Sequence, residues 1–469
     1  MERLLGELVA DAAIPDAHVR GDATVAVTGV VYDSRQVTTG SLFCCLRGLQ
    51  SDGHTFAAAA VASGATALVV DHPLAIEVAQ VVVSDTRAAM GLLSAAYWGH
   101  PTRSLALVGV TGTNGKTTTA SLIASVLAYA GMPCGLIGTL TGPHTTPESP
   151  DLQEQLADFV SGGTRAVVME VSSHGLAFHR VDGCRFAVSV FTNLGRDHLD
   201  LHGTEERYFA AKAELFTSRL SDRGVSNIDD LHGRLLVDVA SIPMVSYSLA
   251  DISEVEVTPT AHAYMWRGER ISVRIGGEFN VLNSLAAATA CAELGIDLAV
   301  IASGLAQASA VPGRFEAVRA GQPFDVIVDY AHTPDGLRAA LIAARSATGG
   351  RLIAVFGCGG DRDREKRPLM GAVAAECADV VVITSDNPRS EDPLGIINAV
   401  YAGVPDDYRA RVVTETDRRL AFTKAFLMAT AGDVVVIAGK GHETTQTIGG
   451  VVLPFDDRAV ARELLEAAK

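Results

Sequence analysis

The chain has 469 residues, of which 48% are hydrophobic and 20% charged, the composition of an ordinary globular protein. Because this length exceeds what one hydrophobic core supports, we expect about three domains. The 54 acidic and 38 basic residues give a net charge of −16, which argues against an extended surface for nucleic acid or membrane. A local basic pocket can still bind an anionic substrate.

The cysteines and the N-terminal residues predict a cytoplasmic protein. The seven cysteines are odd in number and have no Cys-x-x-Cys spacing, so we expect reduced thiols. Residues 1–4 do not begin a signal peptide, and no apolar run approaches the roughly 20 residues of a membrane span. We therefore expect no membrane partner.

The first unit of the chain is predicted to be a small α/β domain. Alanine-rich stretches typical of helices separate short runs of β-forming residues at 27–32, 42–46, 67–70 and 81–83. A second unit begins after Pro101 and extends to the Pro-Gly-Arg at 312–314. A third unit follows. The predicted domains are 1–104, 105–314 and 315–469.

The most informative segment is 110–119, Val-Thr-Gly-Thr-Asn-Gly-Lys-Thr-Thr-Thr, which has the pattern of a phosphate-binding loop. Glycines let backbone N–H groups point at phosphate, Lys116 adds a positive charge, and the Thr117 hydroxyl can join a Mg²⁺ shell. The loop is one residue shorter than the general Walker pattern. A glycine-rich connector is the alternative, but a β-like run before it and helical spacing after it favour ATP. The residues expected to bind ATP here are Gly112, Thr113, Asn114, Gly115, Lys116, Thr117 and Thr118.

Two further predicted strands end in residues that suit a metal. The run 166–169 ends at Glu170, and the run 187–191 leads to Arg196-Asp197-His198. Because parallel strands share one carboxyl edge, Glu170 and His198 should lie along the same edge as the phosphate loop. A carboxylate, an imidazole and a hydroxyl around phosphate oxygens suit Mg²⁺. The alternatives are a solvated acid and a structural histidine.

Lys212 has an unusual position in its predicted helix, 204–216. Thr204 is the expected N-cap, and Tyr208 and Phe216 lie four residues to either side of Lys212 in an apolar stripe. A lysine that faces a core must be neutralised, paired or extended toward solvent. Extension toward solvent is the ordinary outcome, and the other two remain open.

The predicted strands of the third unit share one property, a polar loop after each strand. Nearly continuous Val and Ile runs are typical of a parallel sheet buried on both faces, which binds ligands at the carboxyl ends of its strands. The loops are Asp329-Tyr330-Ala331-His332, Gly359-Gly360-Asp361-Arg362, Asp386-Asn387-Pro388-Arg389 and Gly439-Lys440-Gly441-His442-Glu443.

Several collinear motifs make the chain similar to the Mur ligases of peptidoglycan synthesis, and most of all to their MurE branch. They are the phosphate loop, Glu170-Val171-Ser172-Ser173-His174, Thr192-Asn193-Leu194 with Arg196-Asp197-His198, and Ala210-Ala211-Lys212. The likeness covers the whole chain, from Asp33-Ser34-Arg35 to the four loops of the third unit. It implies an α/β protein with a small N-terminal UDP-binding domain, a central P-loop ATPase-like domain and a C-terminal Rossmann-like domain.

The resemblance also implies an activity. Such enzymes are ATP-dependent amide ligases that add the third amino acid to UDP-MurNAc-L-Ala-D-Glu through an acyl phosphate, and the family lysine at the position of Lys212 is carbamylated. The implied catalytic residues are Lys116, Lys212, Glu170 and His198. The implied Mg²⁺ site consists of Thr117, Glu170, His198 and Lys212. Further ATP contacts are implied for Asn280, Asn283, Arg314, Asp329 and His332, and UDP-MurNAc-dipeptide contacts for Ser34, Thr145, Thr146, Ser172 and Arg180.

The implied amino-acid pocket carries the specificity. Its Asp-Asn-Pro-Arg motif has the form found in enzymes that take meso-diaminopimelate. Arg362 and Arg389 can bind a carboxylate in a bidentate manner, and Glu443 can receive an ammonium group. LL-diaminopimelate and L-lysine are the alternatives for the substrate, and a surface arginine after a turn is the alternative for Arg389. The pocket is expected to consist of Arg362, Asp386, Asn387, Arg389, Gly439 and Glu443.

Two other functions are weighed. A folylpolyglutamate synthetase-like ligase shares the ATP module but lacks the UDP-binding domain and the Asp-Asn-Pro-Arg loop. A non-catalytic nucleotide-binding relative would keep the fold without ligation. We further expect a monomer whose domains close about hinges near 102–105 and 314–317.

Overall fold

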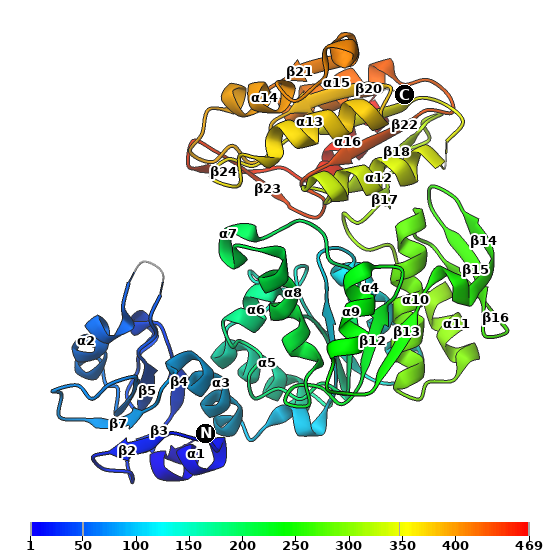
Figure 1. The fold of residues 1–469 in the computed structure, drawn as a ribbon. Helices are drawn as coiled ribbons and strands as arrows, with labels where there is room; N and C mark the ends of the chain where they lie inside the picture. The colour runs from blue at the N-terminus through cyan, green and yellow to red at the C-terminus, as the bar shows by residue number, and fades with distance from the viewer. Residues whose placement is uncertain (1, 49–50, 347, 468–469) are drawn as a thin grey trace.

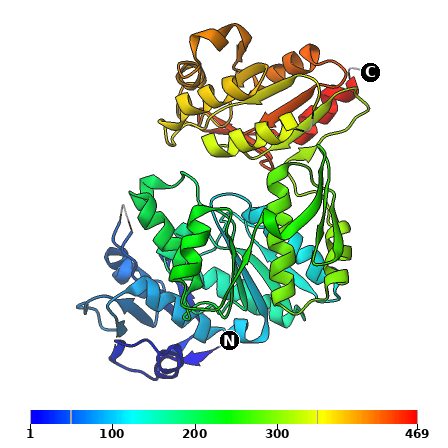
Figure 2. The same ribbon diagram turned by 45° about the vertical axis from the view of Figure 1, so that its right-hand side comes forward.

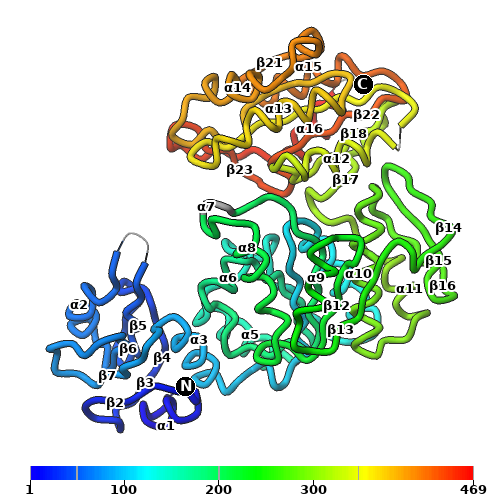
Figure 3. Tube along the Cα trace, in the orientation of Figure 1, coloured from blue at the N-terminus to red at the C-terminus, as the bar shows by residue number. Residues whose placement is uncertain are grey.

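The structure, a computed structural model, describes residues 2–48, 51–346 and 348–467 and contains three α/β units in chain order. The N-terminal unit, in blue, lies at the lower left of the central unit, and the C-terminal unit, in yellow to red, lies above it (Figure 1). The C-terminal unit is also clearly apart in the turned view of Figure 2, and the chain trace of Figure 3 shows all three units separately. The predicted α/β fold class with three domains is confirmed. The boundaries 1–104, 105–314 and 315–469 remain a proposal.

The N-terminal unit is a five-stranded sheet in the order β2-β7-β6-β5-β4, parallel except for β2. The predicted run 27–32 is divided into two short strands, and the first of them pairs antiparallel with β1. Helices cover the sheet, and Asp85 caps α3 by accepting hydrogen bonds from the next turn. The elements are β1 Arg3–Leu4, α1 Leu5–Ala12, β2 His18–Arg20, β3 Ala26–Val27, β4 Gly29–Val31, β5 Ser41–Cys44, α2 Ala57–Ala62, β6 Ala67–Val70, β7 Ala79–Val82 and α3 Thr86–Tyr97.

The central unit is a six-stranded parallel sheet in the order β13-β12-β11-β8-β10-β9. Its strands are nearly continuous apolar runs because helices cover both faces. The elements are β8 Ala106–Thr111, α4 Lys116–Tyr129, β9 Cys134–Ile137, α5 Ser149–Ser161, β10 Ala166–Glu170, α6 Ser173–Ala177, β11 Val188–Phe191, α7 Leu199–His202, α8 Glu205–Ala213, β12 Gly224–Asn227, α9 Leu231–Val239, β13 Met244–Tyr247, α10 Glu278–Glu293 and α11 Leu298–Ala306.

An antiparallel three-stranded sheet within the central unit has no counterpart in the sequence-based prediction. Its strands are β14 Ile252–Val257, β15 His262–Trp266 and β16 Glu269–Val273. One face, with Tyr264, Trp266 and Ile271, joins the core that also contains α4 and α10. The sheet therefore packs with α10, which contributes Asn280 and Asn283 near the phosphate loop.

The C-terminal unit is a six-stranded sheet in the order β17-β18-β22-β19-β20-β21. It is parallel except for β17, at one edge. The elements are β17 Glu316–Ala317, β18 Asp325–Asp329, α12 Pro334–Ser346, β19 Leu352–Phe356, α13 Lys366–Cys377, β20 Val380–Thr384, α14 Pro393–Tyr401, β21 Val412–Glu415, α15 Arg418–Met428, β22 Val434–Ala438, the hairpin β23 Thr445–Ile448 and β24 Val451–Pro454, and α16 Asp457–Ala467.

The strand order decides which loops meet. In the central sheet β8 lies between β10 and β11, so the loops that follow these three strands are neighbours at one edge. In the C-terminal sheet β22 lies between β18 and β19, and β20 is next. The C-terminal unit lies over the carboxyl edge of the central sheet (Figure 1). In the described parts of the chain, no helix is long and apolar enough to cross a membrane.

Candidate active site

The predicted phosphate loop connects β8 to α4. Gly112 and Gly115 have φ values of +146° and +85°, which a residue with a side chain rarely adopts. A Cβ atom on Gly112 would also lie 1.9 Å from the Thr192 hydroxyl oxygen. Neighbouring residues hold the loop, since the Thr113 amide donates to the Asn193 carbonyl at 2.9 Å and the Asn114 amide donates to the Asn193 side chain at 2.9 Å.

Lys116 begins α4 and folds back over the loop. Its Nζ donates to the carbonyl oxygens of Gly112 and Thr113 at 2.8 and 2.9 Å. Burial lowers the pKa of this amine, while the nearby acids Glu170 and Asp197 oppose that shift. The loop and α4 thus present the N-terminus of a 14-residue helix and a lysine at the same point, an arrangement suited to phosphate.

Glu170, the last residue of β10, is 2% exposed and contacts Thr117. The Thr117 hydroxyl donates to Glu170 Oε2 at 2.9 Å, and Thr139 donates from its amide to Oε1 at 2.8 Å. Arg314 also reaches this point, where its guanidinium donates to the Thr117 hydroxyl at 3.0 Å. Two oxygen ligands at the phosphate loop match the preference of Mg²⁺ for oxygen, so these residues fit that ion. Thr139 was not predicted, although it follows the carboxyl end of β9.

Lys212 is buried rather than extended toward solvent. It is 1% exposed, and Nζ donates to the Gly112 carbonyl oxygen at 2.9 Å and lies 4.5 Å from the centre of the Tyr208 ring. Among the residues whose side chains the structure describes, no carboxylate lies within ion-pair distance of Nζ. Burial, followed by repulsion from Lys116, holds the pKa of the Lys212 amine well below its usual range. Thr204 caps α8, as predicted.

His198 lies in the same cleft, but its contacts differ from those of Glu170. Its backbone φ is +52°, its Nε2 is 3.4 Å from Asp197 Oδ2, and its ring packs edge-on against His174 at 4.8 Å. Burial lowers the pKa of His198 to about 4, against the opposing effect of Asp197. The imidazole is therefore neutral at pH 7 and retains a lone pair for a ligand or proton.

A cleft of about 360 Å³ brings the ATP-site candidates of the central and C-terminal units together. Asn283 donates to Asn280 at 2.8 Å, and the Arg314 guanidinium lies 4.3 Å above the Tyr330 ring. Tyr330 was not singled out from sequence. The lining includes Thr113, Asn114, Gly115, Lys116, Thr117, Thr118, Glu170, His198, Asn283, Arg314, Asp329 and His332.

Asp329, a second buried acid of this cleft, is the last residue of β18. Its carboxylate accepts hydrogen bonds from the amides of Phe315 at 2.7 Å and Ala331 at 2.8 Å, which fixes the chain where the central unit leads into the C-terminal unit. Burial raises the pKa of Asp329, while Arg314 and the backbone donors oppose that shift. His332 follows, with Nδ1 2.9 Å from the Tyr330 carbonyl oxygen.

Four of the five candidate dipeptide contacts form one connected group beside the cleft. The Thr146 hydroxyl lies 3.0 Å from that of Ser172, and Arg180 donates to the Thr146 carbonyl at 2.9 Å. The Thr145 hydroxyl is 3.0 Å from that of Thr139, which joins this group to Glu170. Ser34 is separate, in a 3-10 turn of the N-terminal unit.

The candidate amino-acid pocket lies where β20 and β22 end. Asn387 donates to Asp386 at 3.0 Å and to Glu443 at 2.8 Å. Burial raises the pKa of Asp386; Arg418 and Lys440 oppose that shift. Gly439 has φ +112°, and a Cβ atom there would lie 2.8 Å from Asp386 Oδ2.

The two candidate arginines surround Gly359. A Cβ atom on Gly359 would lie 2.9 Å from Arg389 Nη1 and 3.8 Å from Arg362 Cγ. Arg389 is half-buried, has φ +53° and donates to the Gly360 carbonyl at 2.7 Å, while Arg362 is exposed. Arg389 is therefore held in place and is not a free surface arginine, whereas Arg362 can reorient.

Lys440 is a buried member of this pocket whose contacts sequence reasoning did not foresee. It is fully buried and donates to Glu443 at 2.9 Å and to the Thr445 carbonyl at 2.6 Å. Burial tends to raise the pKa of Glu443, but Lys440 and Asn387 lower it overall. Glu443 is thus ionised and can receive an ammonium group.

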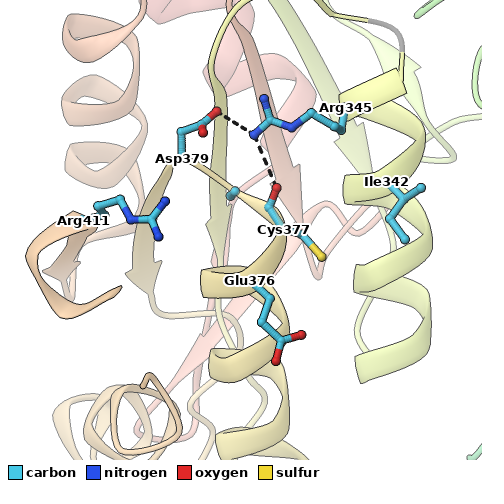
Figure 4. A pocket seen from close by; sticks show the side chains of 7 residues that line it. Ile342, Arg345, Glu376, Cys377, Asp379 and Arg411 are labelled. Carbon is cyan, nitrogen blue, oxygen red and sulfur yellow. Dashed lines mark hydrogen bonds and ion pairs between the residues drawn. The ribbon is translucent and has the colours of Figure 1, made fainter. Parts of the chain in front are cut away.

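A second hollow, of about 370 Å³, lies at the opposite edge of the C-terminal sheet (Figure 4). Asp379 precedes β20, so this edge holds the amino ends of the strands. Arg345 pairs with Asp379 at 2.6 Å and donates to the Cys377 carbonyl at 3.4 Å. The residues that line the hollow include none of the predicted site residues, and its Glu376 pairs with Arg338, which lies outside the lining.

Comparisons with known proteins agree over the whole chain. Three families match: the Mur ligase family catalytic domain at 26–98, the Mur ligase middle domain at 110–291, and the Mur ligase glutamate ligase domain at 313–441. The UDP-N-acetylmuramoyl-L-alanyl-D-glutamate--2,6-diaminopimelate ligase of Geobacillus kaustophilus is 46% identical over an alignment of 474 positions, which covers 96% of this chain and 97% of that protein.

Solved structures agree with the sequence relatives. A UDP-N-acetylmuramoyl-L-alanyl-D-glutamate--2,6-diaminopimelate ligase matches with a TM-score of 0.71 and 35% identity, over 100% of this chain and 99% of that chain. A MurF ligase from Thermotoga maritima in complex with ADP matches with a TM-score of 0.64 over 94% and 97% of the two chains. At 19% identity the latter shares the fold.

Proposed function

This chain belongs to the Mur ligase family, and on that premise we propose that it is an ATP-dependent ligase that adds meso-diaminopimelate to UDP-MurNAc-L-Ala-D-Glu in peptidoglycan biosynthesis. One observation carries the proposal: the phosphate loop and Glu170 line one cleft and the buried Lys212 contacts that loop at Gly112, in a chain 46% identical to a diaminopimelate ligase. The rival function of folylpolyglutamate synthesis is disfavoured because the likeness to the diaminopimelate ligase covers 96% of this chain.

The proposed reaction has two steps. An oxygen of the D-glutamate side-chain carboxylate attacks the γ-phosphorus of ATP, the bond to the bridging oxygen breaks, and ADP leaves. The amine of the incoming amino acid then attacks the acyl carbon, the bond to phosphate oxygen breaks, and phosphate and a proton are released. Lys116 and the α4 N-terminus stabilise charge on the transferred group. Positioning of the bound substrates supplies most of the remaining rate enhancement.

Thr117 and Glu170 would hold Mg²⁺, with His198 on the same cleft and a carbamylated Lys212 beside the phosphate loop. Bound Mg²⁺ would neutralise charge on the phosphate oxygens. Lys212 suits carbamylation because its amine is buried without a paired carboxylate in the described structure, so the neutral form can add CO₂. The product is a carboxylate-like group beside the loop.

For the substrates, we propose that the candidate residues act in three groups. Asn280, Asn283, Arg314, Asp329 and His332 contact ATP with the phosphate loop. Ser34, Thr145, Thr146, Ser172 and Arg180 bind the UDP-MurNAc-dipeptide. The third group binds the amino acid: Arg389, with Arg362, pairs with the distant carboxylate of diaminopimelate, and Glu443 accepts its ammonium. Asp386, Asn387 and Gly439 shape that pocket.

The protein is further proposed to act as a cytoplasmic monomer that closes about its domain boundaries. All seven cysteines are free thiols, in keeping with a reducing compartment. Three substrates bound by three units require closure. The proposal is tested by phosphate release with ATP and UDP-MurNAc-L-Ala-D-Glu, with and without diaminopimelate. Phosphate release that depends on both UDP-MurNAc-L-Ala-D-Glu and diaminopimelate supports ligation. The absence of phosphate release, or phosphate release with a folate substrate, contradicts it.

A further inference from the structure

The N-terminal unit contains a cluster of side chains that the proposed reaction does not use. His54 lies in the 3-10 turn Gly53–Phe56, and Asp71 and His72 follow β6. One ligand atom from each of the three lies within 4.8 Å of the others. His54 Nε2 is 3.3 Å from Asp71 Oδ1, and His72 Nδ1 contacts the same oxygen. Two imidazoles therefore converge on one carboxylate oxygen.

Hydrogen bonds around the cluster orient its ligand atoms. The Nδ1 of His54 is 2.6 Å from Asp52 Oδ1, while the backbone amide of Asp71 donates to His54 Nε2 at 3.3 Å. The proton of His54 is thereby assigned to Nδ1, and the Nε2 lone pair, which accepts the Asp71 amide, lies on the side of the cluster. This matches the outer carboxylate that metal-binding histidines usually have. The His54 side chain is 6% exposed, so its orientation is fixed by packing.

Asp71 is also held in place, by an arginine. Arg47 donates from Nε to Oδ2 at 2.5 Å and from Nη2 to Oδ1 at 3.3 Å, and Oδ1 is the atom that both imidazoles approach. The His72 side chain is 51% exposed, which leaves one side of the cluster open to water.

We propose that His54, Asp71 and His72 form a binding site for a divalent transition metal of the Zn²⁺ class, with water or an anion at the open position. Two imidazole nitrogens and one carboxylate are the donor set that Zn²⁺ and Co²⁺ prefer, whereas Mg²⁺ prefers oxygen. The site lies in a different unit from the phosphate loop. It is independent of the proposed ligase reaction.

The test uses the full-length protein after chelator treatment and dialysis. Co²⁺ is titrated while visible d–d absorption is recorded, and Zn²⁺ binding is measured by calorimetry. The wild type should bind one Co²⁺ at this cluster, with visible d–d absorption typical of a site of low coordination number. His72→Ala, a change at an exposed residue, should weaken that binding on the order of 100-fold, since it removes a direct ligand. The matched control is His18→Ala, which removes an exposed histidine of the same unit and should bind as the wild type does.

A second variant tests the orientation of His54. Asp52→Asn keeps a good N-cap for the 3-10 turn but removes the charge beside Nδ1, and should weaken Co²⁺ binding on the order of tenfold. Any Co²⁺ that binds at the phosphate loop does so in all variants, so a difference in Co²⁺ binding between the wild type and a variant reports on this cluster alone. The proposal is overturned if His72→Ala binds Co²⁺ as the wild type does, or if the absorption of the wild type shows no saturable site of this kind.

Discussion

Lys212 Nζ lies 2.9 Å from the carbonyl oxygen of Gly112, so a residue 100 positions downstream contacts the start of the phosphate loop. The amine is buried beside a second lysine, and both burial and Lys116 lower its pKa. Because protonation is disfavoured, a large fraction of this amine is neutral at a pH where an ordinary lysine is charged. A neutral amine can react with CO₂, and the carbamate would place a negative charge next to Lys116.

Replacement of Lys212 tests this role. Lys212→Ala should lack ligase activity and regain part of it when short carboxylic acids are added, because a free carboxylate can occupy the vacated space. The measurement is the initial rate against acetate or propionate concentration, with Lys424→Ala, a lysine in a surface ion pair, as the control. A Lys212→Ala enzyme that is active without added acid would contradict the carbamate.

Removal of the loop lysine separates catalysis from substrate binding. Lys116→Ala should lower phosphoryl transfer by about 100-fold or more, since a charge at the transferred phosphate is lost. Affinity for UDP-MurNAc-L-Ala-D-Glu should change by less than about threefold, because the nucleotide of that substrate is proposed to bind the N-terminal unit. Calorimetric titration measures the affinity. Losses of affinity and turnover of equal size would refute the proposed division of the substrates among the domains.

Arg389 should select the amino acid. A charged hydrogen bond contributes about 1.5 to 3 kcal/mol, and an unpaired buried carboxylate costs more. Arg389→Ala should therefore lower kcat/KM for meso-diaminopimelate by about tenfold to several hundredfold, and change lysine use far less. Arg364→Ala is the matched control, since Arg364 follows the neighbouring strand β19 but is exposed at 72% and pairs with Glu391. An equal effect of Arg389→Ala on both amino acids would move the discriminating contact elsewhere.

A buried ion pair supports the amino-acid pocket. Arg418 and Asp457 are both 0% exposed, and two hydrogen bonds of 2.8 and 2.6 Å join them. Arg418 also donates to the carbonyl oxygens of Ser385 and Ala438, just before Asp386 and Gly439. Asp457→Asn leaves a buried guanidinium without its counter-charge and should cost about 3 to 5 kcal/mol of unfolding free energy.

The adjacent arginine provides the comparison for that measurement. Arg419 pairs with Glu463 at 2.6 Å, but both side chains are exposed, at 42% and 65%. Glu463→Gln should therefore cost less than about 1 kcal/mol. Urea denaturation of both variants, followed by fluorescence, gives the two values. Equal losses of stability would mean that burial does not set the importance of the Arg418 pair.

Parts of the site could be predicted because local rules determine them. Glu170 meets Thr117 because parallel strands share a carboxyl edge, and glycine spacing with flanking strand and helix identified the phosphate loop. The sequence pattern around Lys212 allowed several interpretations, and burial of the amine was only one of them. An apolar stripe does not reveal whether a long side chain can reach water; the position of Gly112 decides it.

Other features depend on packing between distant segments. Lys440 was visible within a polar loop, but its contacts with Glu443 and the Thr445 carbonyl require the turn before β23. The antiparallel sheet with Tyr264 was missed because only one of its faces is apolar, so its strands lack the continuous apolar runs of the parallel sheets. The approach of His54 to His72 depends on how the chain after β5 returns to the end of β6.

The central claim concerns the amino acid that the enzyme joins to UDP-MurNAc-L-Ala-D-Glu, and the direct test is kcat/KM for meso-diaminopimelate, LL-diaminopimelate and L-lysine. The assay uses the wild-type protein at saturating ATP and UDP-MurNAc-dipeptide, with the product identified by mass. The account predicts the highest value for meso-diaminopimelate, at least about tenfold above lysine, from one charged hydrogen bond at Arg389. A wild-type preference for lysine, or no amide product with any of the three, would contradict it.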